Sequence, residues 1–176
     1  MHTRLRSGAV LCVVLGLIMA SCATTIGTTP TVISLKVTAV RFQDNPILTP
    51  QSSPSLGTNL NGPSLIRVPA WLERPLERYY LYFAHHRGTF IRLAYADRLS
   101  GPWHVYEPGT LQLSEAPSCH DHVASPDVHV DEVRHEIRMY FHCPTNSPGS
   151  GPQRTFLAVS HDGLHFMAEL RVQEGR

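Results

Sequence analysis

The feature of this sequence that most constrains its fold is a β-rich unit that occurs twice in succession. Each unit opens with a proline and an alternating apolar run, continues with an aromatic run, and ends with a third apolar run before a turn. Alternation with period two predicts half-buried strands, and aromatic and β-branched residues favour them. The runs are 61–68, 79–83 and 91–96 in the first unit and 124–130, 137–141 and 155–160 in the second.

The spacing of equivalent residues agrees between the two units. Pro63 and Pro126 are 63 residues apart, and Leu93 and Leu157 are 64 apart. Fourth, outer strands are expected at 111–113 and 169–172. Four short strands repeated at a fixed interval are typical of propeller blades, whereas a sandwich of eight strands would not explain the matched internal order. We therefore expect an all-β fold with two four-stranded antiparallel blades.

Two blades do not close a ring, because propellers typically have four to eight. We expect blade one at about 59–115 and blade two at about 120–176, together forming part of a propeller over 41–176. A strand at Val32–Val40 would complete the last blade of the full ring. On this interpretation the chain is a fragment of a longer reading frame, or else it pairs with other chains.

The first residues have the features of a secretory signal. A basic start precedes an apolar run at 9–20, which is shorter than the roughly 20 residues that a membrane-spanning helix needs. Residues 18–22 resemble a bacterial lipobox that ends at Cys22, with Met19 where leucine is more common. The alternative is an ordinary cleavable signal with a chance cysteine. We expect a signal peptide at 1–21, lipidation of Cys22, and a tether with a first strand at 22–40. This predicts an exported lipoprotein anchored to a membrane in the periplasm or at the cell surface.

Charge and cysteine content limit the function further. The formal net charge of +1 argues against electrostatic attachment to nucleic acid, which depends on dense lysine and arginine. Cys119 and Cys143 are the cysteines that follow Cys22. Outside the cytoplasm they can form a disulfide, although two free buried thiols are equally compatible with their spacing.

Several of these segments together resemble glycoside hydrolase family 43. Pro63-Ser64 opens a strand, a tyrosine-rich strand follows, and the Gly101-Pro102-Trp103 turn comes after the third. Ser125-Pro126-Asp127-Val128 is similar to the motif that opens the family's second blade, and 44–48 to a common lead-in segment. The resemblance covers about 41–168 and implies a five-bladed propeller that acts on polysaccharides containing arabinose or xylose.

The resemblance also implies where catalytic groups belong. Glycoside hydrolysis usually needs two carboxyl groups, one as base or nucleophile and one as acid. The family's base is an aspartate at or just before the first proline, where this sequence has Asn61 and Gly62. Its general-acid glutamate belongs to a later blade, which we expect to be absent here, so the catalytic residues stay unassigned. Asp44, in the preceding loop, is a possible substitute for the base.

Four residues are candidates for binding a sugar. The resemblance places Asp127 near bound sugar, although an aspartate where a strand begins also accepts backbone hydrogen bonds. Asn61 stands at the start of the first unit and either contacts sugar hydroxyls or caps a turn. His85 and His86 follow the second strand. Adjacent residues on a strand point to opposite faces, so only one of the two can face the central axis of the propeller.

Other polar and aromatic residues favour structural roles. The run Cys119-His120-Asp121-His122 matches no tetrahedral zinc spacing, so we expect no metal and no cofactor. We expect Trp103 in the blade core and keep neither it nor Trp71 as a sugar contact. We expect four further histidines of strands and turns to be exposed: His129, His135, His161 and His165.

The sequence therefore predicts a glycoside hydrolase-like protein that acts on or binds an extracellular oligo- or polysaccharide. A non-catalytic glycan-binding propeller is the alternative, which Asn61-Gly62 in place of an aspartate favours. A surface-structure protein with no sugar role is a third possibility.

Overall fold

A computed structural model of the chain describes residues 35–146 and 152–172. The chain divides into two compact units, residues 1–39 and 40–176. In the first unit, described residues 35–39 form no regular element. Every strand formed by the described residues belongs to the second unit. Among the described residues, no helix has the length and apolar character needed to cross a membrane.

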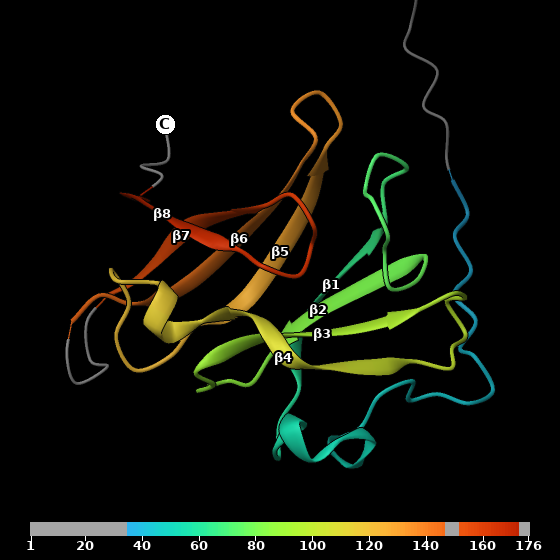
Figure 1. Cartoon of the computed structure of the whole chain (residues 1–176). Helices are drawn as coiled ribbons and strands as arrows, with labels where there is room; N and C mark the ends of the chain where they lie inside the picture. The colour runs from blue at the N-terminus through green and yellow to red at the C-terminus, as the bar shows by residue number, and fades with distance from the viewer. Residues whose placement is uncertain (1–34, 147–151, 173–176) are drawn as a thin grey trace, which may run out of the picture. The chain divides into compact units, whose positions relative to one another are not determined.

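Eight strands form two separate antiparallel sheets, each a simple meander (Figure 1). Sheet A has the order β1-β2-β3-β4, and sheet B has the order β5-β6-β7-β8. This confirms the predicted all-β fold with two four-stranded blades. The strands are β1 (Asn61–Arg67), β2 (Tyr79–Ala84), β3 (Phe90–Ala96), β4 (His104–Gln112), β5 (Ala124–Asp131), β6 (Glu136–Pro144), β7 (Gln153–Ser160) and β8 (Met167–Val172).

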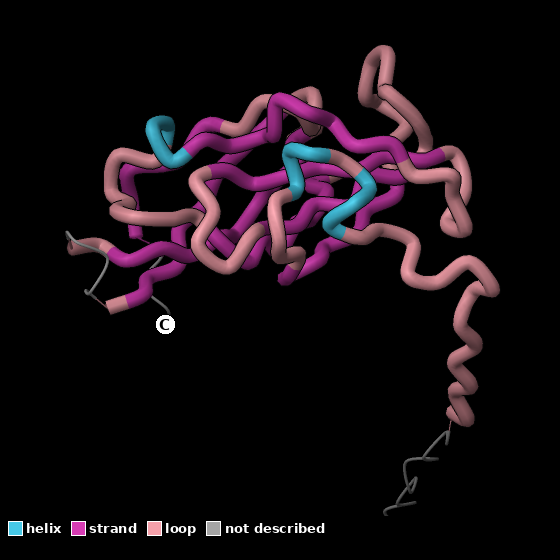
Figure 2. Tube along the Cα trace, turned by 90° about the horizontal axis from the view of Figure 1, so that it is seen from below, coloured by secondary structure: helices cyan, strands magenta, loops and turns pink. Residues whose placement is uncertain are grey.

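The outer strands differ from the expected ranges. Strand β4 begins at His104, well before the expected 111–113, and β8 begins at Met167. The strand predicted at Val32–Val40 is not formed over residues 35–40, and its first residues lie outside the described part. Over residues 35–146 and 152–172, helical turns are limited to three short 3-10 segments: η1 (Pro50–Ser52), η2 (Pro54–Leu56) and η3 (Leu113–Glu115) (Figure 2).

The main hydrophobic core lies between the two sheets. Tyr80 and Tyr82 of β2 are buried in the same cluster as Met139 and Phe141 of β6. The Tyr82 hydroxyl also donates a 2.8 Å hydrogen bond to the carbonyl of Gly163, in the loop before β8. Alternating residues of both sheets thus meet face to face, as the period-two pattern predicts.

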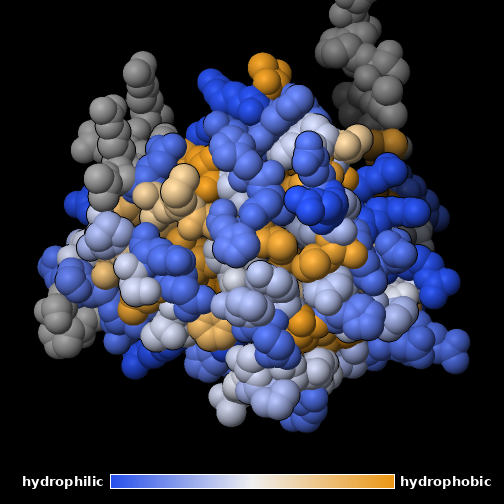
Figure 3. All heavy atoms as spheres, viewed as in Figure 1, coloured by the Kyte–Doolittle hydropathy of each residue, from blue (hydrophilic) through white to orange (hydrophobic). Residues whose placement is uncertain are grey.

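A smaller core covers the other face of sheet A. Leu56 of η2 is buried against Phe83 of β2 and Ala94 of β3, and Leu48 and Leu60 pack beside it. The segment before β1 therefore covers part of this sheet face. On the side seen in Figure 3, apolar side chains reach the surface in separate patches among polar ones.

Both sheets begin with the same irregularity. The register shifts between Asn61 and Ser64 in β1 and between Ala124 and Asp127 in β5. Within each shift one residue before a proline has a positive φ, 57° at Gly62 and 50° at Ser125. Bulges of this kind re-aim side chains near functional sites, so the two strand starts are repeated in conformation as well as in sequence.

The two cysteines that follow Cys22 in the sequence form a disulfide. Cys119 of the loop before β5 is bonded to Cys143 of β6, with the Cα atoms 5.5 Å apart. The sequence left open a disulfide or two free thiols, and the structure has the disulfide. The bond fixes the loop before β5 to sheet B.

Candidate functional site

The starts of β1 and β5 lie against each other. The Ser64 hydroxyl accepts a 2.8 Å hydrogen bond from the N–H of Val128. A Cβ atom added to Gly62 would stand 2.9 Å from the Cα of Ser125. The first residues of these strands pair with the last part of β2 and β6, since Asn61 lies opposite Ala84 and Ala124 opposite His142. We call this end of the two sheets the strand-start end.

Asn61 is held at this end by a second asparagine. Its Nδ2 donates a 3.0 Å hydrogen bond to Oδ1 of Asn59, which also accepts a 2.9 Å bond from the N–H of His86. The Oδ1 of Asn61 is buried and has no hydrogen-bond partner among the described residues. A buried acceptor without a donor costs about 1–3 kcal/mol, which a bound donor would offset.

The histidine pair has two different settings. Nδ1 of His85 accepts a 3.1 Å hydrogen bond from the N–H of Arg87 and so supports the turn between β2 and β3. His86 is exposed, and its backbone joins the Asn59 network. Asn61 and His86 are thus brought together through Asn59, while His85 stabilises the neighbouring turn.

Asp127 is separate from that network. Its carboxylate is 68% exposed and lies 3.0 Å from Nε2 of His129 on the same strand. The register places Ser64, not Asn61, at the equivalent position of sheet A, because Asp127 pairs with Tyr140 and Ser64 with Tyr82. No hydrogen bond in the described part of the chain joins Asp127 to Asn61.

Two further histidines, which the sequence analysis did not place at a binding site, lie at the strand-start end. His122 is largely buried, and its Nδ1 lies 3.0 Å from a carboxylate oxygen of Asp121. Burial lowers the pKa of His142, and the nearby His122 and His86 lower it further. Within residues 35–146 and 152–172, no three histidine, cysteine or acidic side chains are arranged to hold a metal ion.

Arg92 of β3 is another polar residue that the sequence analysis did not assign to the site. It is only 5% exposed, and its Nη1 donates a 3.2 Å hydrogen bond to the carbonyl of Asn59. Its Nε is buried and has no partner among the described residues. The signal in the sequence was a charged residue inside the apolar run 91–96.

The other candidate residues lie elsewhere. Asp44 borders a depression at the turn between β3 and β4, together with Arg98 and Trp103. Trp103 packs on the smaller core, and its Nε1 donates to the carbonyl of Leu99 at 3.2 Å. Trp71 donates to Glu132 at 2.9 Å and stacks on His135, so both indole N–H groups have protein partners. His129, His135, His161 and His165 are exposed, as expected.

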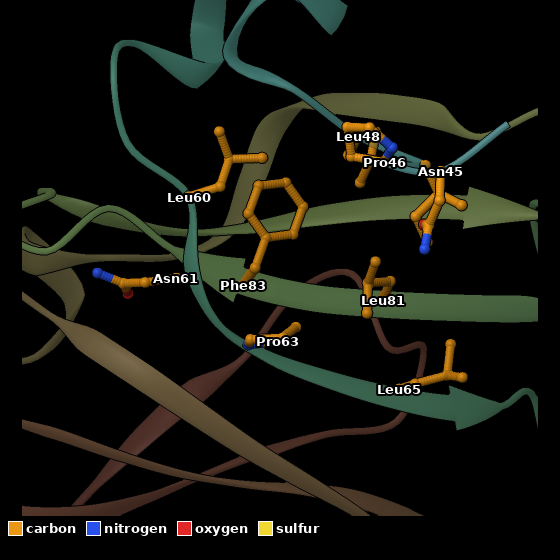
Figure 4. A pocket seen from close by; sticks show the side chains of 10 residues that line it. Asn45, Pro46, Leu48, Leu60, Asn61, Pro63, Leu65, Leu81 and Phe83 are labelled. Carbon is orange, nitrogen blue, oxygen red and sulfur yellow. The ribbon is translucent and has the colours of Figure 1, made fainter. Parts of the chain in front are cut away.

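An apolar pocket of about 440 Å³ lies on the face of sheet A turned away from sheet B (Figure 4). Leu81 and Phe83 of β2 form its floor, and Asn61 and Asn45 stand at opposite ends of it (Figure 4). The segment before β1 supplies Pro46 and Leu48 as one wall. The pocket therefore adjoins the strand-start end but is walled by apolar groups.

Comparisons with known proteins identify the fold. No protein-family profile matches the sequence. An uncharacterized protein of Acanthamoeba polyphaga mimivirus is 34% identical over 146 residues, which cover 72% of this chain and 41% of that protein. The chain thus spans about two fifths of the length of this relative.

Solved structures of family 43 glycoside hydrolases are similar in fold. The GH43_1 enzyme from Xanthomonas citri has a TM-score of 0.52 and 15% identity, over 64% of this chain and 32% of the enzyme. The same enzyme has been solved in complex with xylotriose and with xylose. A thermostable family-43 glycoside hydrolase has a TM-score of 0.50 over 66% of this chain and 34% of the enzyme. At this identity the similarity shows the fold alone: the two sheets have the fold of part of a glycoside hydrolase-like propeller.

Proposed function

We propose that the strand-start end binds an oligo- or polysaccharide of the arabinose or xylose type. The observation that carries this proposal is Asn61, whose amide is fixed by Asn59 at the start of an inner strand while its Oδ1 has no donor in the described part of the chain. The similarity in fold to an enzyme crystallised with xylose and xylotriose supports the choice of ligand.

The residues at this end suit the chemistry of sugar hydroxyls. Each hydroxyl both donates and accepts, so it pairs with amide and carboxylate groups. Asn61 offers an acceptor in need of a donor, and the exposed carboxylate of Asp127 offers further acceptor sites on the neighbouring strand start. His86 adds an exposed ring beside Asn61.

Binding without hydrolysis is the function that the local geometry favours. Hydrolysis usually requires two carboxyl groups that flank the glycosidic bond. Positions 61 and 62 carry no carboxyl group. Gly62 also has no room for a side chain, because an added Cβ would stand 2.9 Å from the Ser125 backbone. Hydrolysis of O-glycosyl bonds is the second candidate, which the similarity to glycosidases and the exposed carboxylate of Asp127 favour.

Calorimetric titration with xylo- and arabino-oligosaccharides tests the proposal. We expect heat of binding with at least one series, weakened at least tenfold by Asn61→Ala and to a smaller degree by Asp127→Ala. Asp97→Ala serves as the matched control, because Asp97 is exposed beyond β3, at the opposite end of sheet A. Absence of heat with every sugar on a folded sample would refute the proposal. Release of reducing sugar would establish hydrolysis instead.

We also propose that the protein is exported and lipidated at Cys22. Support comes from the basic start, the short apolar run and the lipobox-like residues 18–22. Metabolic labelling with a fatty acid in a bacterial host should mark the wild type and not Cys22→Ser. Equal labelling of both proteins would exclude this cysteine as the anchor.

A further inference from the structure

Arg92 is a buried cation without an acidic partner. It lies on the face of β3 that carries Ala94, opposite Phe83 of β2, and is 5% exposed. None of the ion pairs formed by the described residues includes it. Its guanidinium carbon lies 5.1 Å from the centre of the Phe90 ring, and its one hydrogen bond to the described residues runs from Nη1 to the carbonyl of Asn59.

Such an arrangement is costly in an isolated chain. A buried charge is normally paired and fully hydrogen-bonded, because removal from water is otherwise strongly unfavourable. Burial lowers the pKa of Arg92, yet a guanidinium remains charged at neutral pH. The Nε, which is buried without a partner, is thus a charged donor with no acceptor among the described residues.

The guanidinium belongs to the strand-start end. Asn59 links it to Asn61, since the Asn59 carbonyl accepts from Arg92 and its side chain accepts from Asn61. The Arg92 Nη2 and the Cδ2 of His85 both lie 3.8 Å from the position of a Cβ on Gly57. Asn59 is therefore bonded to two side chains that each have a buried polar atom without a partner among the described residues: Nε of Arg92 and Oδ1 of Asn61.

We propose that Arg92 binds the carboxylate of an acidic sugar, so that the ligand is a glycan containing uronic acid. This inference rests on the proposed function and narrows its substrate class. The edge of the guanidinium formed by Nε and Nη2 donates to no described residue, and such an edge matches a carboxylate with two parallel hydrogen bonds. A hydroxyl of the same sugar donates to Oδ1 of Asn61. Because Arg92 is covered by the segment that contains Gly57 and Asn59, this segment shifts when the sugar enters.

The experiment compares xylo-oligosaccharides of equal length with and without a glucuronate branch. Calorimetric titration of the full chain should give an affinity about tenfold higher for the acidic sugar, as a charge-assisted hydrogen bond implies. Arg92→Met should remove this preference, so that the acidic and the neutral sugar bind with equal affinity. Arg67→Met, at the other end of β1, is the control and should leave both affinities unchanged. Hydrogen exchange at residues 57–60 should change on binding of the acidic sugar.

A second measurement does not depend on the fold of a variant. The methyl ester of the glucuronate branch, titrated into the wild type, should bind no better than the neutral sugar. Equal affinity for the acid, the ester and the neutral sugar would overturn this inference and leave the proposed function intact. An acid preference that persists in folded Arg92→Met would overturn it as well. Absence of binding by all three sugars would overturn both proposals.

Discussion

Gly62 and Ser125 approach each other so closely that a Cβ on Gly62 would stand 2.9 Å from the Ser125 Cα. Both residues precede a proline at the start of an inner strand, and both have a positive φ. The contact joins the two sheets at the strand-start end. It also means that a carboxylate at position 62 would need the two strand starts to move apart.

We predict that Gly62→Ala destabilises the protein. A positive φ of 57° in a residue with a side chain costs about 1–3 kcal/mol, and the contact with the Ser125 backbone adds to that cost. Ser125→Gly is the control, for which we expect an unchanged or increased free energy of unfolding. The reason is that glycine adopts a φ of 50° more readily than serine does. Urea unfolding would measure the stability of both variants. A Gly62→Ala variant as stable as the wild type would contradict the close approach of Gly62 to Ser125.

A second prediction concerns the hydrogen bond between the inner strands. Ser64→Ala leaves the N–H of Val128 without its 2.8 Å acceptor, and we expect a loss of about 1–2 kcal/mol in the free energy of unfolding. Ser114→Ala, an exposed serine of η3, should change it by less than about 0.5 kcal/mol. Equal unfolding midpoints for the two variants would show that the Ser64 bond does not contribute.

Removal of the disulfide should destabilise sheet B. The bond closes a loop with a sequence separation of 24, for which chain entropy gives a contribution of about 3 kcal/mol. Thermal unfolding with and without a reductant measures it, and the variant with both Cys119→Ala and Cys143→Ala should match the reduced wild type. If that double variant responds to reductant as the wild type does, the effect does not come from this bond.

The smaller core offers a prediction about the segment before β1. Leu56 is fully buried against Phe83 and Ala94, so Leu56→Ala should cost about 2–5 kcal/mol. Leu35→Ala should have little effect, since that leucine is 82% exposed. Similar unfolding midpoints for the two variants would mean that this segment does not stabilise sheet A in solution.

The order of the strands could be predicted from the sequence, whereas the extent of one edge strand could not. Runs such as Tyr79–Phe83 are dense in aromatic residues with high β propensity, so local information was sufficient. Strand β4 contains Pro108 and Gly109, which are typical of a turn, yet it continues through them to Gln112. An edge strand tolerates proline, and the register shift between Ile91 and Leu93 accommodates these residues.

The candidate site was only partly predictable for a similar reason. Asn61, His85 and His86 could be named because they flank recognisable strands. The role of Arg92 depends on its cover by the segment around Asn59, about 33 residues earlier in the chain. Burial by a distant loop leaves no local pattern, so a charged residue within an apolar run was not recognised as a buried one.

The final prediction concerns the acid stability of the loop between β7 and β8. Burial raises the pKa of Asp162, but hydrogen bonds from the side chain and N–H of His165, from the N–H of Leu164 and from Ser160 outweigh it. Together they lower the pKa from 3.8 to about 2. Because the folded value lies below the unfolded one, the ionised carboxylate stabilises the fold above pH 4. This contribution is lost as the pH falls from about 4 to about 2.

Urea midpoints between pH 6 and pH 2 would test the role of Asp162. Asp162→Asn should be less stable than the wild type at pH 6, and the difference should shrink as the pH approaches 2. Asp97→Asn is the control, because the Asp97 carboxylate is exposed and accepts no hydrogen bond from the described residues. It should follow the wild type at every pH. A constant difference between Asp162→Asn and the wild type across this range would show that the carboxylate charge is not responsible.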